Sequence, residues 1–231
     1  MKKVEFKIGK DTLRGSLFIP KGKGPFPSVI FLHGSGGVGE TYFAIAEKLS
    51  KKGILGFAFN YRGAGVSDGK FEDQTIAMGI EDAMFAFKFL QSQEEVDRKR
   101  IGICGGSLGG FIAGVLSTTL NPKSIVLSAP ASYSPLIVSS VQRDSDDLRK
   151  DWDESDSYKN IASFRGSLLV IKCELDDVLP AGMVEKYAEA AVSSSRKEEF
   201  LLKGAKHRIS IQPQPRKILI AKIIEWFKET L

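Results

Sequence analysis

The chain has 231 residues, of which 42% are hydrophobic, and its formal net charge is +5. The lysines and arginines are interleaved with acids, and this distribution indicates a solvated surface and no nucleic-acid partner. This length and composition suit one soluble α/β domain covering residues 1–231. No apolar run approaches the roughly 20 residues that span a bilayer, and the N-terminus lacks the apolar stretch of a secretory signal, so we expect a cytoplasmic protein with no membrane partner.

Strand and helix patterns alternate along the chain. An antiparallel hairpin is predicted over residues 4–19, because apolar and polar residues alternate on both sides of a turn at 9–11. Further strands are predicted at 27–32, 54–59, 101–104, 124–128, 167–173 and 199–202. Helices, with apolar residues at helical spacing, are predicted at 42–51, 76–87, 111–116, 182–192 and 220–227. This order implies an α/β fold with a mostly parallel sheet and helices on both faces.

The stretch 131–164 breaks this rhythm, because it is polar and rich in acids. We expect it to form a short cap, or a long irregular loop, inserted within the single domain. Its apolar residues are candidates for lining an acyl pocket or, equally, for ordinary packing against the sheet: Leu136, Ile137, Val138, Val141 and Trp152.

The segment from Gly105 to Gly109 has the pattern G-x-S-x-G around Ser107. It follows the strand at 101–104 and precedes a helix, which is the context of a nucleophile elbow. A serine on so sharp a bend lies in a crowded backbone conformation, and glycines two before and two after remove the side chains that would clash. A phosphate-binding loop would need a lysine directly before a Ser or Thr at its end, and none is present. We therefore predict that Ser107 is a nucleophile, and a glycine-rich turn with an incidental serine is the alternative interpretation.

A serine hydroxyl needs a base and an acid that orients the base. The chain has two histidines, and both follow predicted strands. His207 is the predicted base, because the loop after the last strand can lie over the sheet, whereas His33 ends a central strand and is expected to hold its own loop. Asp176 is the predicted acid. Asp177, which also suits a helix N-cap before Pro180, and Glu174 are the alternatives.

Two backbone N–H groups are expected to hold the negative charge that develops on a substrate carbonyl oxygen. One is that of Leu108, directly after the nucleophile and at the start of a helix. The other is that of Ser35, in the glycine-rich loop 33–37 that follows the strand at 27–32. A plain turn is the alternative interpretation of that loop.

Together these features resemble the α/β-hydrolase superfamily of serine hydrolases, over nearly the whole chain. The segments that carry the resemblance are His33-Gly34-Ser35-Gly36-Gly37, residues 61–69, Gly105 to Gly109, Asp176 and His207. The resemblance implies an eight-stranded sheet with the hairpin at one edge, and a triad of Ser107, Asp176 and His207. Residues 67–76 and 80–83 look like those of cinnamoyl (feruloyl) esterases, although the segment 131–164 is shorter than their cap.

The strand order that this resemblance implies separates the two cysteines, Cys104 and Cys173, by one intervening strand. Their distance would then be roughly 10 Å, because neighbouring strands lie about 4.8 Å apart. A disulfide tolerates at most about 7 Å between Cα atoms. Two free thiols are therefore expected.

These residues together predict a serine hydrolase that cleaves small-molecule carboxylic esters through an acyl-enzyme on Ser107, with no cofactor and no metal. A serine peptidase, thioesterase or acyltransferase on the same fold is an alternative that the triad does not separate. A non-catalytic binding module is an alternative of another class, disfavoured because no triad member is missing. The sequence leaves the assembly open, a homodimer included.

Overall fold

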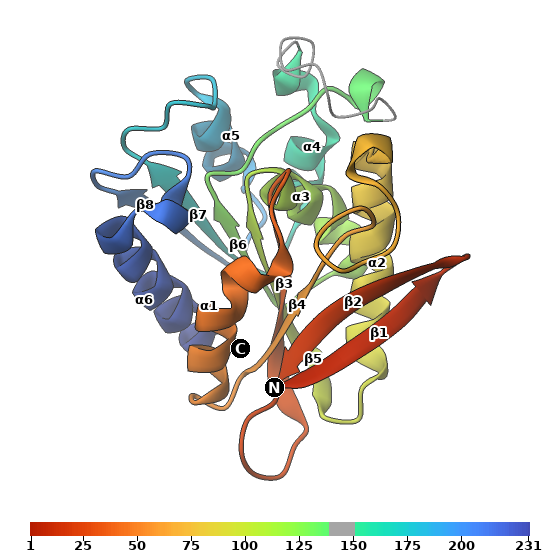
Figure 1. The fold of residues 1–231 in the computed structure, drawn as a ribbon. Coiled ribbons are helices and arrows are strands. Elements are labelled where there is room, and N and C mark those ends of the chain that lie inside the picture. Colours follow the sequence, from red (N-terminus) through yellow and green to blue (C-terminus); the bar gives the residue numbers. More distant parts are fainter. Residues whose placement is uncertain (139–150) are drawn as a thin grey trace.

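The computed structural model describes residues 1–138 and 151–231, and its centre is one eight-stranded sheet (Figure 1). The strands are β1 (Lys2–Ile8), β2 (Asp11–Phe18), β3 (Phe26–Leu32), β4 (Leu55–Phe59), β5 (Val96–Gly106), β6 (Ser124–Ser128), β7 (Ser167–Cys173) and β8 (Arg196–Leu202). Their spatial order is β1-β2-β4-β3-β5-β6-β7-β8. The hairpin β1–β2 is antiparallel and lies at one edge, β2 runs antiparallel to β4, and the other neighbours are parallel. The predicted fold is confirmed.

Helices cover both faces of the sheet. They are α1 (Phe43–Ser50), α2 (Ile76–Ser92), α3 (Leu108–Leu120), α4 (Asp156–Ser163), α5 (Met183–Ala190) and α6 (Pro213–Thr230). Within residues 1–138 and 151–231, short 3-10 turns accompany them: η1 (Gly39–Tyr42), η2 (Phe71–Asp73), η3 (Pro135–Ile137), η5 (Trp152–Glu154) and η6 (Ile209–Ile211). In the part of the chain that the structure describes, no helix has the length and apolarity needed to cross a bilayer.

Successive side chains of the central strands point to opposite faces, so the sheet has a hydrophobic core on each side. On β3, Val29 and Phe31 face the side covered by α1 and α6, whereas Ile30 and Leu32 face the side covered by α2 and α3 (Figure 1). All four side chains are at most 1% exposed. Burial on both faces explains why these strands are continuous apolar runs in the sequence.

The predicted cap or loop at 131–164 falls partly on residues 139–150, which lie outside the described residues. Its described parts contain η3, η5 and the helix α4, which the sequence did not predict. Ser155 caps α4 by accepting a hydrogen bond from the Ser157 N–H, and Tyr158 and Ile161 are its large buried side chains. The helix also meets α3, where the Asn160 side chain donates to the Val115 carbonyl at 2.6 Å.

Cys104 lies on β5 and Cys173 on β7, with β6 between them, as the implied strand order placed them. Both thiols are buried and free.

Candidate active site

The candidate site lies where the parallel strands end. Ser107 directly follows β5, Asp176 follows β7, and His207 follows β8, while the loop 33–37 follows β3. Because β3, β5, β6, β7 and β8 are parallel neighbours, their carboxyl ends lie along one edge of the sheet. This edge is where ligands bind in open α/β sheets.

Ser107 has an unusual backbone conformation, with φ at 51° and ψ at −120°. A positive φ is rare for a residue with a side chain and costs free energy unless its surroundings impose it. Here the Ser107 N–H donates to the Ser128 carbonyl at 3.1 Å, and the Ser107 carbonyl accepts from the N–H groups of Gly110 and Ala131. These bonds hold the sharp bend between β5 and α3.

The two glycines that flank Ser107 are required by close backbone contacts. A Cβ atom on Gly105 would lie 2.2 Å from the Gly109 carbonyl oxygen. A Cβ atom on Gly109 would lie 2.0 Å from the Leu32 carbonyl oxygen, at the end of β3. Both distances are far below van der Waals contact, so this turn accepts no side chain at either position, as the sequence pattern predicted.

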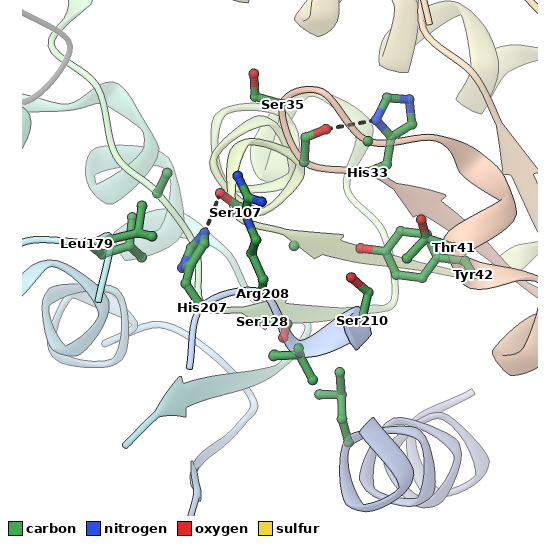
Figure 2. Close-up of a pocket in the computed structure, with 18 of the residues that line it drawn as sticks. His33, Ser35, Thr41, Tyr42, Ser107, Ser128, Leu179, His207, Arg208 and Ser210 are labelled. Carbon is green, nitrogen blue, oxygen red and sulfur yellow. Dashed lines mark hydrogen bonds between the residues drawn. The ribbon is translucent and has the colours of Figure 1, made fainter. Parts of the chain in front are cut away.

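Two hydrogen bonds connect the side chains of Ser107, His207 and Asp176, and Figure 2 shows the one between Ser107 and His207. His207 Nε2 lies 3.0 Å from Ser107 Oγ, and His207 Nδ1 lies 2.9 Å from Asp176 Oδ2. The side chains of His207 and Asp176 are 10% and 11% exposed, so water screens their contact only weakly. The structure therefore brings together the three residues that the sequence singled out, from three different loops.

Asp176 stays ionised in this setting. Burial raises the pKa of its carboxyl, but hydrogen bonds from His207 and from the N–H groups of Leu179 and Val178 outweigh burial, and the pKa is lowered. The two backbone bonds, at 3.0 Å each, go to Oδ1 and leave Oδ2 for the imidazole. A carboxylate fixed in this way orients the His207 ring and stabilises its protonated form.

The two alternative acids contact the same loop but not the imidazole. Asp177 accepts a long hydrogen bond from the His207 backbone N–H at 3.4 Å and pairs with Lys206. Glu174 accepts from the Gly204 N–H at 2.7 Å. The helix α5 begins only at Met183, so Asp177 does not cap it, contrary to the role that its place before Pro180 suggested.

His33 is the other histidine near the site, and it has a different environment. Its ring is 3% exposed, Nε2 accepts a hydrogen bond from the Tyr61 backbone N–H at 3.4 Å, and Nδ1 donates to the Gly34 carbonyl at 2.9 Å. Burial lowers the pKa of the imidazole to about 4, so the ring is neutral at pH 7. With both ring nitrogens engaged by backbone groups, His33 holds its loop, as expected, and does not act on Ser107.

The loop after β3 lies against the candidate nucleophile. A Cβ atom on Gly34 would lie 3.3 Å from Ser107 Cβ. The Gly34 carbonyl accepts hydrogen bonds from His33 and from the Gly37 N–H, which fix the direction of that peptide group. Because the C=O and N–H of a trans peptide point in opposite directions, these bonds direct the Ser35 N–H away from His33. Leu108, the other expected donor, is the first residue of α3.

A cavity of about 450 Å³ opens at Ser107 and His207 (Figure 2). One part of its wall comes from residues 131–133 and from the loop that contains Leu179 and Pro180. Another part comes from η1, α1, η6 and the first turns of α6. Its volume is in the range of small-molecule sites, and its wall is largely apolar.

The sequence did not predict this lining. Leu136, Ile137, Val138 and Trp152 do not line the cavity, and Val141 lies outside the described residues. Leu136 is exposed, whereas Val138 and Trp152 pack against the core on the α2 and α3 side of the sheet.

Residues that the sequence reasoning missed line the cavity instead, from elements far apart in the chain: Tyr42, Ile45, Arg208, Arg216, Leu219 and Ile220. The one sequence signal that could have found any of them is the position of Arg208, directly after His207.

Comparison with known proteins gives the same fold and a family. The Hydrolase_4 family model, described as serine aminopeptidase, S33, matches residues 24–148, slightly more than half of the chain. An uncharacterized protein of Mycobacterium tuberculosis is 32% identical over 185 residues, which cover 80% of this chain and 64% of that protein. Esterase EstD of Thermotoga maritima is 33% identical over 129 residues, covering 51% of this chain and 30% of the esterase. The chain thus spans less than two thirds of the length of these relatives.

Solved structures extend the likeness in fold. Est1E from Butyrivibrio proteoclasticus, solved with ferulic acid bound, superposes with a TM-score of 0.80 over 98% of both chains at 18% identity. A monoacylglycerol lipase of Paleococcus ferrophilus superposes with a TM-score of 0.74, at 19% identity, over 95% of this chain and 99% of the lipase.

Proposed function

Because the chain belongs to the Hydrolase_4 family, described as serine aminopeptidase, S33, we propose that it is a serine hydrolase that cleaves carboxylic esters through an acyl-enzyme on Ser107. The observation that carries the proposal is the pair of hydrogen bonds from Ser107 Oγ to His207 Nε2 and from His207 Nδ1 to Asp176 Oδ2, at 3.0 and 2.9 Å. Both lie within the range that a working nucleophile and base require.

In the proposed first half-reaction, His207 Nε2 takes the hydroxyl proton as Ser107 Oγ attacks the ester carbonyl carbon. The carbonyl oxygen gains a negative charge, which the N–H groups of Ser35 and Leu108 stabilise. His207 then gives the proton to the leaving alcohol oxygen, and the acyl group stays on Ser107. In the second half-reaction His207 Nε2 takes a proton from water as the water oxygen attacks the acyl carbon. The bond between that carbon and Ser107 Oγ then breaks, the acid leaves, and His207 returns the proton to Oγ.

An ester is favoured over a free peptide by the charges that line the cavity. An aminopeptidase must bind the α-ammonium group of its substrate, and a carboxylate is the usual counter-charge for a buried ammonium. Among the residues that the structure describes, the cavity wall contains no aspartate or glutamate and contains Arg208 and Arg216. Such a wall disfavours a free amino terminus near Ser107, and Esterase EstD supplies a relative with an esterase name.

The test is a substrate panel with p-nitrophenyl esters, methyl ferulate, acyl-CoA thioesters and aminoacyl p-nitroanilides. Turnover of esters is expected, and Ser107→Ala should lower kcat by about 10⁶-fold, because the serine and its base act as a unit. Ser92→Ala, at the end of α2 and outside the cavity, is the matched control. Hydrolysis of the anilides alone would favour the peptidase instead. Failure of a fluorophosphonate to label Ser107 would indicate a binding module.

The same panel separates the two neighbouring aspartates. Asp176→Asn should lower kcat by about 10⁴-fold, because an amide no longer fixes the imidazole in the productive tautomer. Asp177→Asn removes the same charge one residue along, where the carboxylate contacts Lys206 and the His207 backbone but not the imidazole, and it should cost less than about tenfold. Equal losses from the two variants would contradict the assignment of Asp176.

A further inference from the structure

The cavity at Ser107 contains two positive charges and, among the residues described, no carboxylate in its wall. Arg208 directly follows the proposed base, and Figure 2 shows its side chain extending into the cavity that Ser107 and His207 line. Arg216 lines the same cavity from the start of α6. The rest of the wall is largely apolar, and the ionised Asp176 lies behind His207 and is engaged by its imidazole, so these guanidinium groups are the charges that the described wall offers to a ligand.

The backbone that carries Arg208 is fixed by one glutamine. The Gln212 side chain donates to the carbonyls of Lys206 and Arg208, at 2.9 Å each, and accepts from the Lys206 N–H at 3.0 Å. The Gln212 side chain therefore links the end of the loop between β8 and α6 to the backbone at its start. In this way Gln212 fixes the backbone of Arg208 next to His207 and does not contact the Arg208 guanidinium.

Arg216 lies on the face of α6 that is turned toward the cavity. Leu219 and Ile220, three and four residues further along the helix, line the same cavity and are buried. Side chains at this spacing share one face of a helix. Arg216 is itself half-buried, so its charge lies close to the apolar wall.

Neither guanidinium group has an acidic partner among the described residues. Of the six other described arginines, four have one: Arg14 pairs with Asp68, Arg62 with Asp82, Arg100 with Asp97, and Arg196 with Glu229, whereas Arg98 and Arg165, which do not line the cavity, have none within the described ranges. Arg208 is exposed at the mouth of the cavity and Arg216 is partly buried, so both guanidinium groups are accessible to a ligand that enters beside Ser107. A guanidinium binds a carboxylate through two parallel hydrogen bonds, which fits a ligand that brings its own anion.

We propose that the substrate is an ester that carries a second, free carboxylate, which Arg208 and Arg216 bind while Ser107 attacks the ester carbonyl. This inference rests on the proposed esterase function and specifies its substrate class. The substrate is either a monoester of a dicarboxylic acid or an ester of a hydroxy acid. In the first case the charge stays on the acyl-enzyme, and in the second it leaves with the alcohol.

Two pairs of esters with matched shapes test the proposal. Monomethyl glutarate is paired with methyl 5-methylhexanoate, and 4-acetoxybutyrate with 4-methylpentyl acetate, so that an isopropyl group replaces the carboxylate in each pair. Hydrolysis is followed by pH-stat titration. In at least one pair, kcat/KM for the anionic ester should exceed that for the neutral one by about tenfold or more, which corresponds to about 1.4 kcal/mol. The pair that shows the preference identifies the side of the ester that carries the charge.

The readout in the variants is this anionic-to-neutral ratio, so a general loss of activity does not imitate the expected result. The double variant Arg208→Gln/Arg216→Gln should bring the ratio to about one, and Arg208→Lys should keep part of it. Lys217→Gln removes the same charge from the next position of α6, outside the cavity wall, and should keep the full ratio. Salt at about 1 M should lower the ratio, because it shortens the screening length to about 3 Å.

A ratio of one or less in both pairs would overturn the inference, as would a preference that survives in the double variant. If no ester of the four is turned over, the rate of fluorophosphonate labelling of Ser107 replaces hydrolysis as the readout. Monomethyl glutarate should then protect Ser107 at lower concentration than its neutral partner, and equal protection would also overturn the inference. Absence of both turnover and labelling would overturn the proposed esterase function, and this inference with it.

Discussion

The two histidines near Ser107 have the same side chain, and their surroundings give them different properties. His207 lies at the cavity with one ring nitrogen on a hydroxyl and the other on a carboxylate. His33 is buried, and both of its ring nitrogens contact backbone groups. Its neutral ring can accept from the Tyr61 N–H only at the unprotonated Nε2, so protonation would break a bond that connects the 33–37 loop to the end of β4.

This difference predicts an acid-sensitive contribution of His33 to stability. Burial lowers the pKa of its imidazole to about 4 in the folded chain, compared with about 6.5 in the unfolded chain. The contribution is therefore fully present above pH 6.5 and is lost as the pH falls toward 4, because the unfolded chain binds the proton first. Between pH 7 and 4.5, the loss from this one group should be about 2 kcal/mol in the free energy of unfolding.

Urea denaturation of the parent protein and of His33→Asn, at pH 7 and at pH 4.5, measures this contribution. An asparagine at position 33 does not titrate, and its amide N–H can replace Nδ1 as the donor to the Gly34 carbonyl, although it is too short to replace Nε2 as the acceptor for the Tyr61 N–H. The variant should be less stable at pH 7, and it should lose about 2 kcal/mol less than the parent on acidification. Parallel pH profiles for the two proteins would contradict a neutral, buried His33.

At the scale of elements, the ion pair between Arg62 and Asp82 connects the loop after β4 to α2. Arg62 donates to the Asp82 carboxylate from Nε at 2.6 Å and from its backbone N–H at 2.7 Å, and its guanidinium also contacts Glu81. The Asp82 side chain is 1% exposed and that of Arg62 is 12% exposed. The preceding residue of this loop, Tyr61, contacts His33, so the pair also supports the loop beside Ser107.

Removal of Arg62 should therefore be costly. Arg62→Leu leaves the buried Asp82 carboxylate without its cation, and we expect a loss of about 3 kcal/mol in the free energy of unfolding at pH 8. Burial already raises the pKa of Asp82 to about 6, against the hydrogen bonds from Arg62, and loss of Arg62 raises it further. Since a raised carboxyl pKa adds stability as the pH falls through it, the deficit of the variant should shrink at pH 5.

Two further variants make this prediction specific. Glu81→Gln removes the exposed partner of Arg62 and should cost less than about 1 kcal/mol. Arg62→Leu/Asp82→Asn removes the uncompensated charge and should recover part of the lost stability at pH 8. A double variant less stable than Arg62→Leu, measured by urea denaturation, would show that Asp82 is stabilising without its cation.

The elements differ in how far the sequence could predict them. The hairpin and the central strands were predicted because alternation and buried apolar runs are local signals, which chain neighbours alone produce. The helix α4 was missed because its stability comes from distant parts of the chain. Its two large buried side chains are too few for a clear helical pattern, and its polar residues contact α3 and α5 through Asn160 and Ser157.

At the scale of the whole molecule, the same distinction separates the candidate triad from its cavity. Ser107 and its glycines form a local motif, and the loops after β7 and β8 offered few candidates for an acid and a base. Spacing does not distinguish Asp176 from Asp177, because adjacent residues in a loop point in different directions that the sequence does not specify. The cavity wall was not predictable, because it depends on how α1 and α6 pack against one face of the sheet.

The position of the two cysteines within the folded sheet gives a prediction for the molecule as a whole. Cys104 and Cys173 are at most 1% exposed, on strands separated by β6. Burial raises the pKa of both thiols, that of Cys173 to about 12, so almost no reactive thiolate forms in the folded protein at pH 8. A thiol reagent such as Ellman's reagent should therefore react with the native protein only as fast as the sheet opens.

Titration in denaturant without reductant should find two thiols per chain, and Cys104→Ser should reduce the number to one. In the native protein, the reaction should be slow and should accelerate with urea in step with global unfolding, because neither strand can expose its cysteine while the sheet stays intact. Rapid reaction of one thiol in the native state would show that β5 or β7 opens locally. Absence of thiols in the denatured chain would require the two strands to lie closer together than an eight-stranded sheet in this order permits.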